Sequence, residues 1–329
     1  MLRISTKHTR EQDRHEELDK QRSPLLPRII KLAAVILLIA APFIVAAFLS
    51  MLSNSTLEVA RYDIRNEKLT DSPVRVVMIS DLHRKKLDET NQQVVDKTAL
   101  EKPDIIVVNG DMLEHDCTEE EVEAFAYLLE RLCAIAPVYF SVGNHDFRAF
   151  YSEYEVASRK EYLIGTEQTD AVKRLESTGA RYLERNYADI EVNGERLRIG
   201  GLYALAYPNT CYTVEQYLPI LEYIYDFCDT DAFTMMLAHR PRSFAHPLVD
   251  INWNIDLILS GHTHNGVIAL PFGLGAIWCA SEFLPKYDRG LFDMNGCSLI
   301  IGAGIDGHRG IIPRIFNPPE IVTVDIRPK

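Results

Sequence analysis

The positions of apolar residues along the chain predict an alternation of strands and helices from residue 74 onward. The expected strands are short apolar runs rich in β-branched residues, at residues 74–79, 105–109, 138–142, 234–238, 255–260 and 320–326. The expected helices have apolar residues three or four positions apart, at residues 88–100, 119–133, 168–178 and 215–227. Residues 190–199 alternate around Asn193-Gly194, which predicts a hairpin. Together these elements predict an α/β domain in which helices flank two packed, mixed β-sheets.

A different pattern precedes this domain. Leu32 to Leu49 is an uncharged apolar run of 18 residues, which as a helix would span roughly 27 Å, close to the hydrocarbon core of a bilayer. Pro42 lies inside it, as lipid-embedded helices tolerate. A buried core helix would show a polar face, and a cleaved signal peptide a shorter apolar region of ~7–15 residues. We therefore interpret residues 29–52 as an uncleaved transmembrane anchor, with those two readings as the alternatives.

The charges beside this run predict its orientation. Residues 1–31 carry eight Lys and Arg against five Asp and Glu, and the next basic residue after the run is Arg61. By the positive-inside rule the polar tail, residues 1–28, stays in the cytoplasm and the protein is single-pass. Residues 53–72 form a polar connector with one strand-like piece. Residues 73–329 are then the catalytic domain, placed outside the cytoplasm.

Composition narrows the class of partner. The 329 residues are 47% hydrophobic and carry a net charge of −12, so nucleic acid is not an expected partner. The six cysteines include no Cys-x-x-Cys pair, and whether they pair is left open.

Five short segments carry histidine and aspartate just after expected strands. In chain order they are Asp81-Leu82-His83, Gly110-Asp111, Gly143-Asn144-His145-Asp146, His239-Arg240-Pro241 and Gly261-His262-Thr263-His264. The carboxyl ends of strands in open α/β sheets meet at one edge, so we expect these side chains to lie together. They offer nitrogen and oxygen ligands without a thiolate, which suits two divalent ions of the Mn, Fe or Zn class.

In this order the five segments resemble the motifs of the calcineurin-like metallophosphoesterases. The resemblance covers residues 74–326, and residues 314–321 are similar to the end of the membrane-anchored bacterial branch of that family. It implies an αββα sandwich with a dinuclear metal site. The implied ligands are Asp81, His83 and His264 for one ion, Asn144, His239 and His262 for the other, and Asp111 as the bridge between them.

The resemblance also implies how the reaction proceeds. His145 would remain unligated and act on the substrate as the catalytic residue, with Asp146 orienting it. A water held by the two ions would lose a proton near neutral pH, and the resulting hydroxide would attack phosphorus. We expect a phosphodiesterase acting on a lipid or envelope polymer at the membrane. The alternatives are a phosphomonoesterase and a non-catalytic binding scaffold of the same fold.

Some positions carry weaker signals. His239 belongs to a short motif, and His246 is its rival as a ligand. Asn265-Gly266 stands where relatives often have Gly-Gly-Gln, which bears on substrate contacts. Residues 147–166 are rich in tyrosine and charge and are expected to form a substrate loop. His115 and His308 match no motif and are expected in polar loops, and residues 302–307 predict a tight turn near the site.

Overall fold

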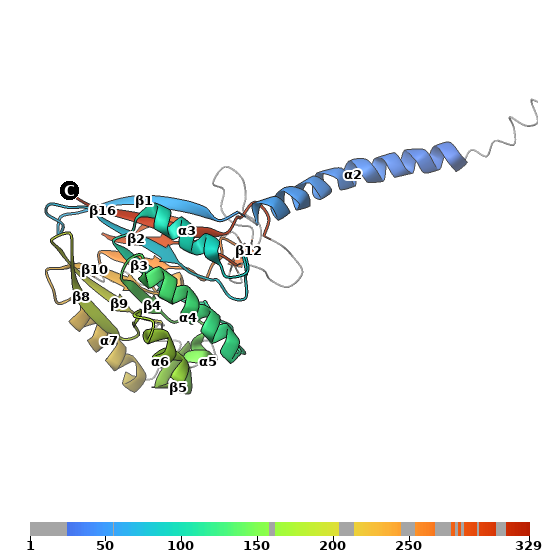
Figure 1. The fold of residues 1–329 in the computed structure, drawn as a ribbon. Coiled ribbons are helices and arrows are strands. Elements are labelled where there is room, and N and C mark those ends of the chain that lie inside the picture. Colours follow the sequence, from blue (N-terminus) through green and yellow to red (C-terminus); the bar gives the residue numbers. More distant parts are fainter. Residues whose placement is uncertain are drawn as a thin grey trace, which may run out of the picture. The chain divides into compact units, whose positions relative to one another are not determined.

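The structure is a computed structural model with two compact units, Met1–Leu49 and Ser50–Lys329, and each is described by itself. It describes residues 25–54, 56–157, 162–203, 214–244, 254–266, 278–279, 282–283, 286–294, 296–306 and 314–329. Helices and strands carry the labels of Figure 1.

The described part of the first unit is one long helix, α2 (Leu25–Ser53), which has Pro42 inside it and ends just beyond the unit. From Pro27 to Ala46 its side chains are not buried by the rest of the chain, and Leu38 is 78% exposed. A core helix would bury such apolar side chains, so that alternative is wrong. The helix is long and apolar enough to cross a membrane. The expected N-terminal apolar helix is therefore confirmed.

The second unit contains two mixed β-sheets. In the described residues the first sheet has six strands, in the order β1 (Glu58–Asn66), β16 (Glu320–Pro328), β2 (Val74–Ile79), β3 (Ile105–Asn109), β4 (Val138–Ser141) and β7 (Arg181–Tyr182). The pairing of β16 with β2 is antiparallel and the other pairings are parallel.

The second sheet, counted over the same described ranges, also has six strands. Their order is β14 (Gly290–Met294), β15 (Cys297–Ile301), β11 (Leu257–Ser260), β10 (Phe233–Leu237), β9 (Glu195–Gly201) and β8 (Asn186–Val192). The two outer pairings are antiparallel and the three inner pairings are parallel. The β8–β9 hairpin turns at Asn193-Gly194, where both residues have positive φ, as a type I′ turn requires.

Helices cover the outer faces of both sheets. They are α3 (Gln92–Glu101), α4 (Glu119–Cys133), α5 (Phe147–Phe150), α6 (Asp170–Glu176) and α7 (Val214–Cys228), together with the short 3-10 turn η1 (Pro241–Ser243). Figure 1 shows α3 and α4 on one side of the sheets and α7 on the other. A capping box at Thr118 fixes the start of α4. The Thr118 hydroxyl accepts a hydrogen bond from the backbone N–H of Glu121, and the Glu121 carboxylate accepts one from the backbone N–H of Thr118.

The alternation of side chains along β2 shows how the layers are held together. Val76 and Met78 point into the core between the sheets, beside residues of β10 and β11. Val77 and Ile79 point the other way and pack under α4. On the far side, Phe227 of α7 packs with residues of β10, β11 and β15. The four layers confirm the αββα sandwich.

Two segments differ from the expectations. The strand-like piece of the 53–72 segment is β1, paired with β16 over nine residues, so the first sheet begins within that segment. The expected substrate loop at 147–166 instead forms α5 and the hairpin β5 (Tyr151–Ala157) and β6 (Tyr162–Gln168). The alternation of residues along β5 was obscured by a register shift between Tyr151 and Tyr154. A further short pair, β12 (Trp278–Cys279) and β13 (Glu282–Phe283), is antiparallel.

Candidate metal centre

The five histidine- and aspartate-bearing segments meet at one edge of the sandwich. Asp81, Asp111 and His145 follow the ends of β2, β3 and β4, and His239 and His262 follow the ends of β10 and β11. These are neighbouring strands within each sheet, so their loops converge.

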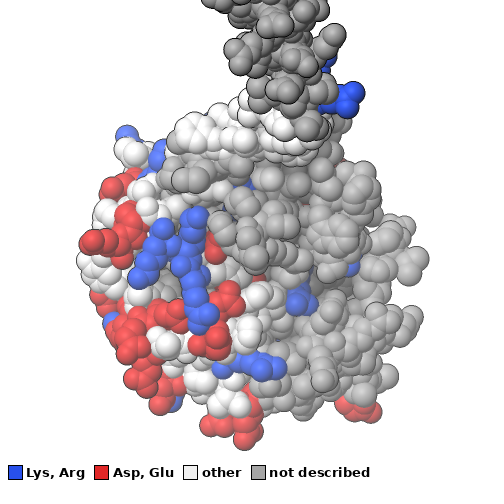
Figure 2. Space-filling view, turned by 90° about the vertical axis from the view of Figure 1, so that its right-hand side faces the viewer, with Lys and Arg blue, Asp and Glu red and all other residues white. Residues whose placement is uncertain are grey.

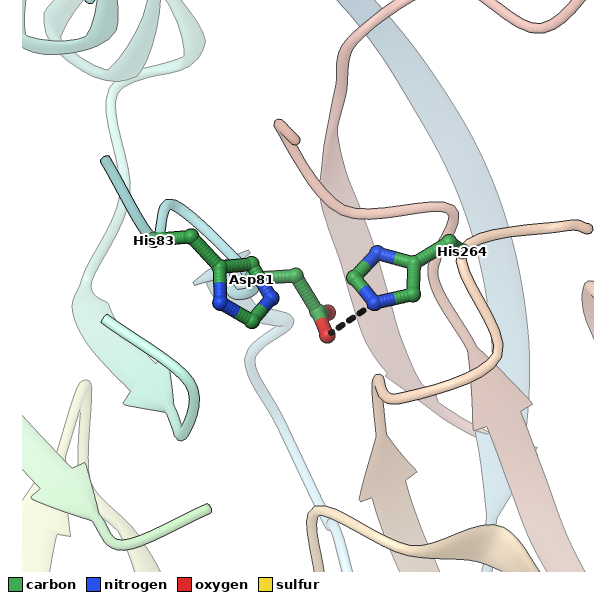
Figure 3. A group of neighbouring side chains, drawn as sticks. All are labelled: Asp81, His83 and His264. Atoms are coloured by element: carbon green, nitrogen blue, oxygen red, sulfur yellow. Dashed lines mark ion pairs between the residues drawn. The ribbon is translucent and has the colours of Figure 1, made fainter. Parts of the chain in front are cut away.

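The first cluster joins three side chains that the sequence analysis assigns to one ion. Asp81, His83 and His264 each offer a ligand atom, and these atoms lie within 4.8 Å of one another. Figure 3 shows the two imidazoles on either side of the Asp81 carboxylate. The Nε2 atom of His264 lies 3.7 Å from Asp81 Oδ1, too far for a hydrogen bond but suited to two ligands of one cation.

The second cluster contains Asp111, His239 and His262, again with ligand atoms within 4.8 Å of one another. The Nε2 of His239 lies 2.9 Å from Asp111 Oδ2, yet neither atom has an aligned hydrogen-bond partner. Asp81 Oδ2 is also buried without a partner. Buried polar atoms normally find partners, so these three atoms fit ligands of bound metal ions. Asp111 also belongs to a cluster with His83, which places it next to both candidate positions.

Asn144 lies beside the second cluster but is engaged differently. Its Oδ1 accepts a hydrogen bond from Arg240 Nε at 3.3 Å. Arg240 therefore brings a positive charge to the site, and burial, together with this charge, lowers the pKa of His262. Arg240 is thus a site residue to which the motif resemblance gives no role.

Hydrogen bonds at Nδ1 orient three of the histidines. His239 donates to the carbonyl of Asn109 at 2.8 Å and His264 to that of Asp306 at 2.6 Å. His83 Nδ1 contacts Glu114 Oε1 at 2.9 Å. With Nδ1 engaged, Nε2 is the nitrogen left to bind a cation in each case.

The backbone at the site is held in an uncommon conformation. Five of the expected ligands have φ between 50° and 68°: Asp81, His83, Asp111, His262 and His264. Left-handed backbone at residues other than glycine is uncommon and gathers at functional sites. Position 143 requires glycine for a steric reason, because a Cβ there would overlap the Asp111 carboxylate. The predicted turn near residue 304 is present, with Ile305 N donating to Ser80 O and Asp306 N to Asp81 O.

Glu114 is a site residue that the sequence analysis missed. One of its carboxylate oxygens contacts His83 Nδ1 and the other contacts His145 Nδ1, at 2.9 Å and 2.7 Å. His145 is 38% exposed, so it can reach a bound substrate. The available signal was position, since Glu114 follows Asp111 by three residues in the same loop.

The expected orientation of His145 by Asp146 was wrong. The buried carboxylate of Asp146 instead accepts from the backbone N–H groups of Gly143 at 2.6 Å and Met112 at 3.1 Å. It thereby joins the loops after β3 and β4. Burial and the charge of Asp111 raise the pKa of Asp146.

Comparison with known proteins agrees with this geometry. The family model described as calcineurin-like phosphoesterase matches residues 74–266. The chain belongs to the calcineurin-like phosphoesterase family. The resemblance drawn from the five motifs is thus confirmed, and the protein is a member of a family of phosphoester hydrolases with dinuclear metal sites.

Relatives of this phosphoesterase extend the likeness over most of the chain. An uncharacterized metallophosphoesterase of Aquifex aeolicus (strain VF5) is 28% identical over 288 residues, covering 85% of this chain and 95% of the relative. A transmembrane protein with metallophosphoesterase domain from Danio rerio is 26% identical over 293 residues, covering 82% of this chain and 57% of the relative. Together with α2, the second relative indicates membrane anchoring.

The electrostatics of the phosphoesterase site fit bound cations. Burial opposes protonation of His83 and His239, but nearby carboxylates outweigh it and raise the pKa of each to about 9. Asp111 contributes to both shifts. This excess of negative charge is what divalent ions would neutralise. Burial lowers the pKa of His264 to about 4, which keeps it in the neutral form that binds metals.

Arg314 and Asn317 support the loop of the phosphoesterase site that carries His264, although the motif resemblance gives their segment no role at the site. Both are fully buried and donate to the carbonyl of His264. His115 is largely exposed beside Glu114. His246 and His308 lie outside the described residues.

Proposed function

We propose that this protein is a membrane-anchored, dinuclear-metal phosphodiesterase whose domain faces away from the cytoplasm. The observation that carries the metal site is the pair of clusters joined at Asp111, with buried and unpartnered ligand atoms on Asp81, Asp111 and His239. Nitrogen and oxygen ligands without a thiolate favour Mn, Fe or Zn.

The assigned ligands keep the pattern of the family. Asp81, His83 and His264 would hold one ion, Asn144, His239 and His262 the other, and Asp111 would bridge them. When bound, the ions would supply positive charge for the phosphoester oxygens and a nucleophile from water at neutral pH.

The chain's own groups would position the substrate and move the proton. His145 has Nδ1 engaged by Glu114, so Nε2 faces the site and would donate a hydrogen bond or proton to the leaving oxygen. Arg240 would offset negative charge on the substrate from the side of the second cluster. A diester at the membrane surface is the favoured substrate, because α2 anchors the site there.

The test uses the full chain in detergent with added Mn²⁺, assayed on bis-p-nitrophenyl phosphate and p-nitrophenyl phosphate. We expect turnover of the diester to exceed that of the monoester, and both His145→Ala and Asp111→Asn to lose it. Asp96→Asn, which changes an exposed residue of α3 outside the clusters, is the control for Asp111→Asn. Faster monoester turnover would make the protein a phosphomonoesterase. Metal binding without turnover of either ester would favour the non-catalytic scaffold.

Orientation needs a separate measurement. The basic residues before α2 support a cytoplasmic N-terminus. Protease added outside bacterial spheroplasts should therefore digest the 50–329 unit. Protection of this unit until the membrane is permeabilised would place it in the cytoplasm.

A further inference from the structure

A small cavity opens beside the candidate metal centre. It has a volume of about 90 Å³ and lies between the loop that follows β2 and the N-terminal half of α4. His83 and Glu114 form part of its lining and also belong to the metal centre, so the cavity adjoins the site at these two side chains.

The walls of this cavity are mainly apolar. They include Leu82, Met112, Leu113, Ala124, Phe125 and Leu128. Apolar cavities of about 150 Å³ take up molecules the size of benzene. A cavity of about 90 Å³ is therefore sized for a short stretch of alkyl chain rather than for a ring with substituents.

Five charged residues also line the cavity, namely the basic Arg84, Lys85 and Lys86 and the acidic Glu114 and Glu121. Arg84 is paired with Asp116 and Glu121, whereas among the described residues Lys85 and Lys86 form no ion pair. Figure 2 shows a group of Lys and Arg side chains bordered by Asp and Glu on the face it presents. Two uncompensated lysines on a protein of net charge −12 supply charge complementary to an anionic ligand.

We infer that this cavity is a substrate subsite that binds the first carbons of an alkyl chain on a phosphodiester, with Lys85 and Lys86 attracting its anionic phosphate. The inference rests on the proposed phosphodiesterase function and narrows its substrate to an amphiphile of the lipid type. In the reaction, water oxygen bonds to phosphorus, the bond from phosphorus to the leaving oxygen breaks, and that oxygen takes the proton.

The experiment uses p-nitrophenyl esters of methyl, ethyl, butyl and hexyl phosphate with the full chain in lipid nanodiscs and Mn²⁺. Hydrolysis releases p-nitrophenol and leaves the alkyl phosphate. We expect kcat/KM to rise by up to about fourfold for each methylene and to level off once the cavity is filled. A flat series would overturn the subsite while leaving the phosphodiesterase function standing. Preference for a thymidine ester over the butyl ester would assign the cavity to a nucleobase instead.

Two pairs of variants distinguish a specific effect of the cavity on substrate binding from general effects of substitution on the protein. Ala124 is exposed on α4 and lines the cavity, so Ala124→Phe should fill it and abolish the chain-length dependence. Glu119→Phe, also exposed on α4 but not part of the cavity lining, should keep the dependence. Lys86→Gln should lower kcat/KM severalfold at low salt, whereas Lys97→Gln on α3, which does not line the cavity, should change it little. Equal effects of these two variants would contradict the role of the lysines.

Binding gives a readout that does not depend on turnover. If no ester is hydrolysed, the proposed function fails, and calorimetry with butyl phosphate and methyl phosphate then decides the subsite by itself. Tighter binding of butyl phosphate that Ala124→Phe removes would support it. Equal binding of the two phosphates would overturn it.

Discussion

The guanidinium of Arg314 donates a hydrogen bond from Nη2 to Asn317 Oδ1 at 2.9 Å, and the two side chains together hold the loop that carries His264. Arg314 also donates to the carbonyl oxygens of Ala303, Gly304 and Ile305. These bonds join the C-terminal segment to the turn that packs on Asp81.

The first prediction concerns Asn317. Its Nδ2 donates to the carbonyls of His264 at 2.6 Å and Gly266 at 2.8 Å, so Asn317→Ala should loosen the loop and misplace His264. We expect Mn²⁺ affinity to fall by about 10-fold to 100-fold, as for other residues that orient metal ligands. Titration calorimetry measures this, with folding checked by circular dichroism. The control is Asn66→Ala, which removes a hydrogen bond to Asp256, since neither residue belongs to the metal clusters. A lower melting temperature with unchanged metal affinity would make Asn317 a purely structural residue.

A second prediction addresses Glu114. This carboxylate holds both His83 and His145, so Glu114→Ala should lower kcat by roughly 10-fold to 100-fold through loss of orientation. Glu114→Gln should recover part of the activity, because an amide can still bond one imidazole. The decisive readout is the split between kcat and KM, since loss of orientation should lower kcat with little change in KM. Asp116→Asn in the same loop should leave kcat near the wild-type value, and a loss there of equal size would refute a specific role for Glu114.

Metal stoichiometry supplies a third prediction. Asp111 borders both clusters, whereas Asp81 belongs only to the first. Asp111→Asn should therefore weaken the binding of both ions. Asp81→Asn should leave the binding of the ion held by His239 and His262 unchanged. Elemental analysis after dialysis should find well below one ion per chain in the first variant and about one in the second. Binding also stabilises the folded state, so Mn²⁺ should raise the melting temperature least in Asp111→Asn. Two retained ions in Asp111→Asn would exclude its bridging role.

Much of the sandwich could be predicted because its central strands are covered on both faces. Such strands are nearly continuous apolar runs, as at Ile105–Asn109, whose bounds match β3. The helix at Glu119–Cys133 was predicted to the residue because its start is a local signal, the capping box at Thr118. The helix expected at 88–100 begins later, at Gln92, where the Asp88 side chain accepts from backbone N–H groups of its first turn.

The supporting residues of the site were harder to infer. Glu114 contacts a histidine 31 positions before it and another 31 positions after it, and Arg314 contacts a carbonyl 50 positions away. No local spacing rule reaches that far, because such contacts depend on how the strands are ordered in the sheets. Asp146 shows the converse error, since the motif resemblance implied a contact with His145, whereas the carboxylate of Asp146 accepts from the backbone N–H of Gly143.

A fourth prediction follows from two buried glutamates with opposite pKa shifts. Burial raises the pKa of Glu184 to about 7, although Tyr203 N donates to it. Between about pH 4.3, where the unfolded chain releases this proton, and pH 7, the folded state still holds it. Stability should therefore fall as pH rises through this window, by on the order of 3 kcal/mol in total for this group. The glutamine of Glu184→Gln cannot ionise, so the stability of this variant relative to the wild type should increase from pH 5 to pH 8.

The pKa of Glu195 is shifted downward, so its effect on stability has the opposite dependence on pH. Burial alone would raise its pKa, but backbone N–H groups of Ser72, Asp71 and Thr70 donate to the carboxylate and lower it. The stability it contributes is present above about pH 4.3 and is lost as pH falls through the lower folded pKa. Glu195→Gln should therefore destabilise the protein more at pH 7 than at pH 3.5. Urea unfolding of both variants across this range tests the pair, and parallel pH profiles for the wild type and Glu184→Gln would show that Glu184 is ionised in the folded state at pH 5.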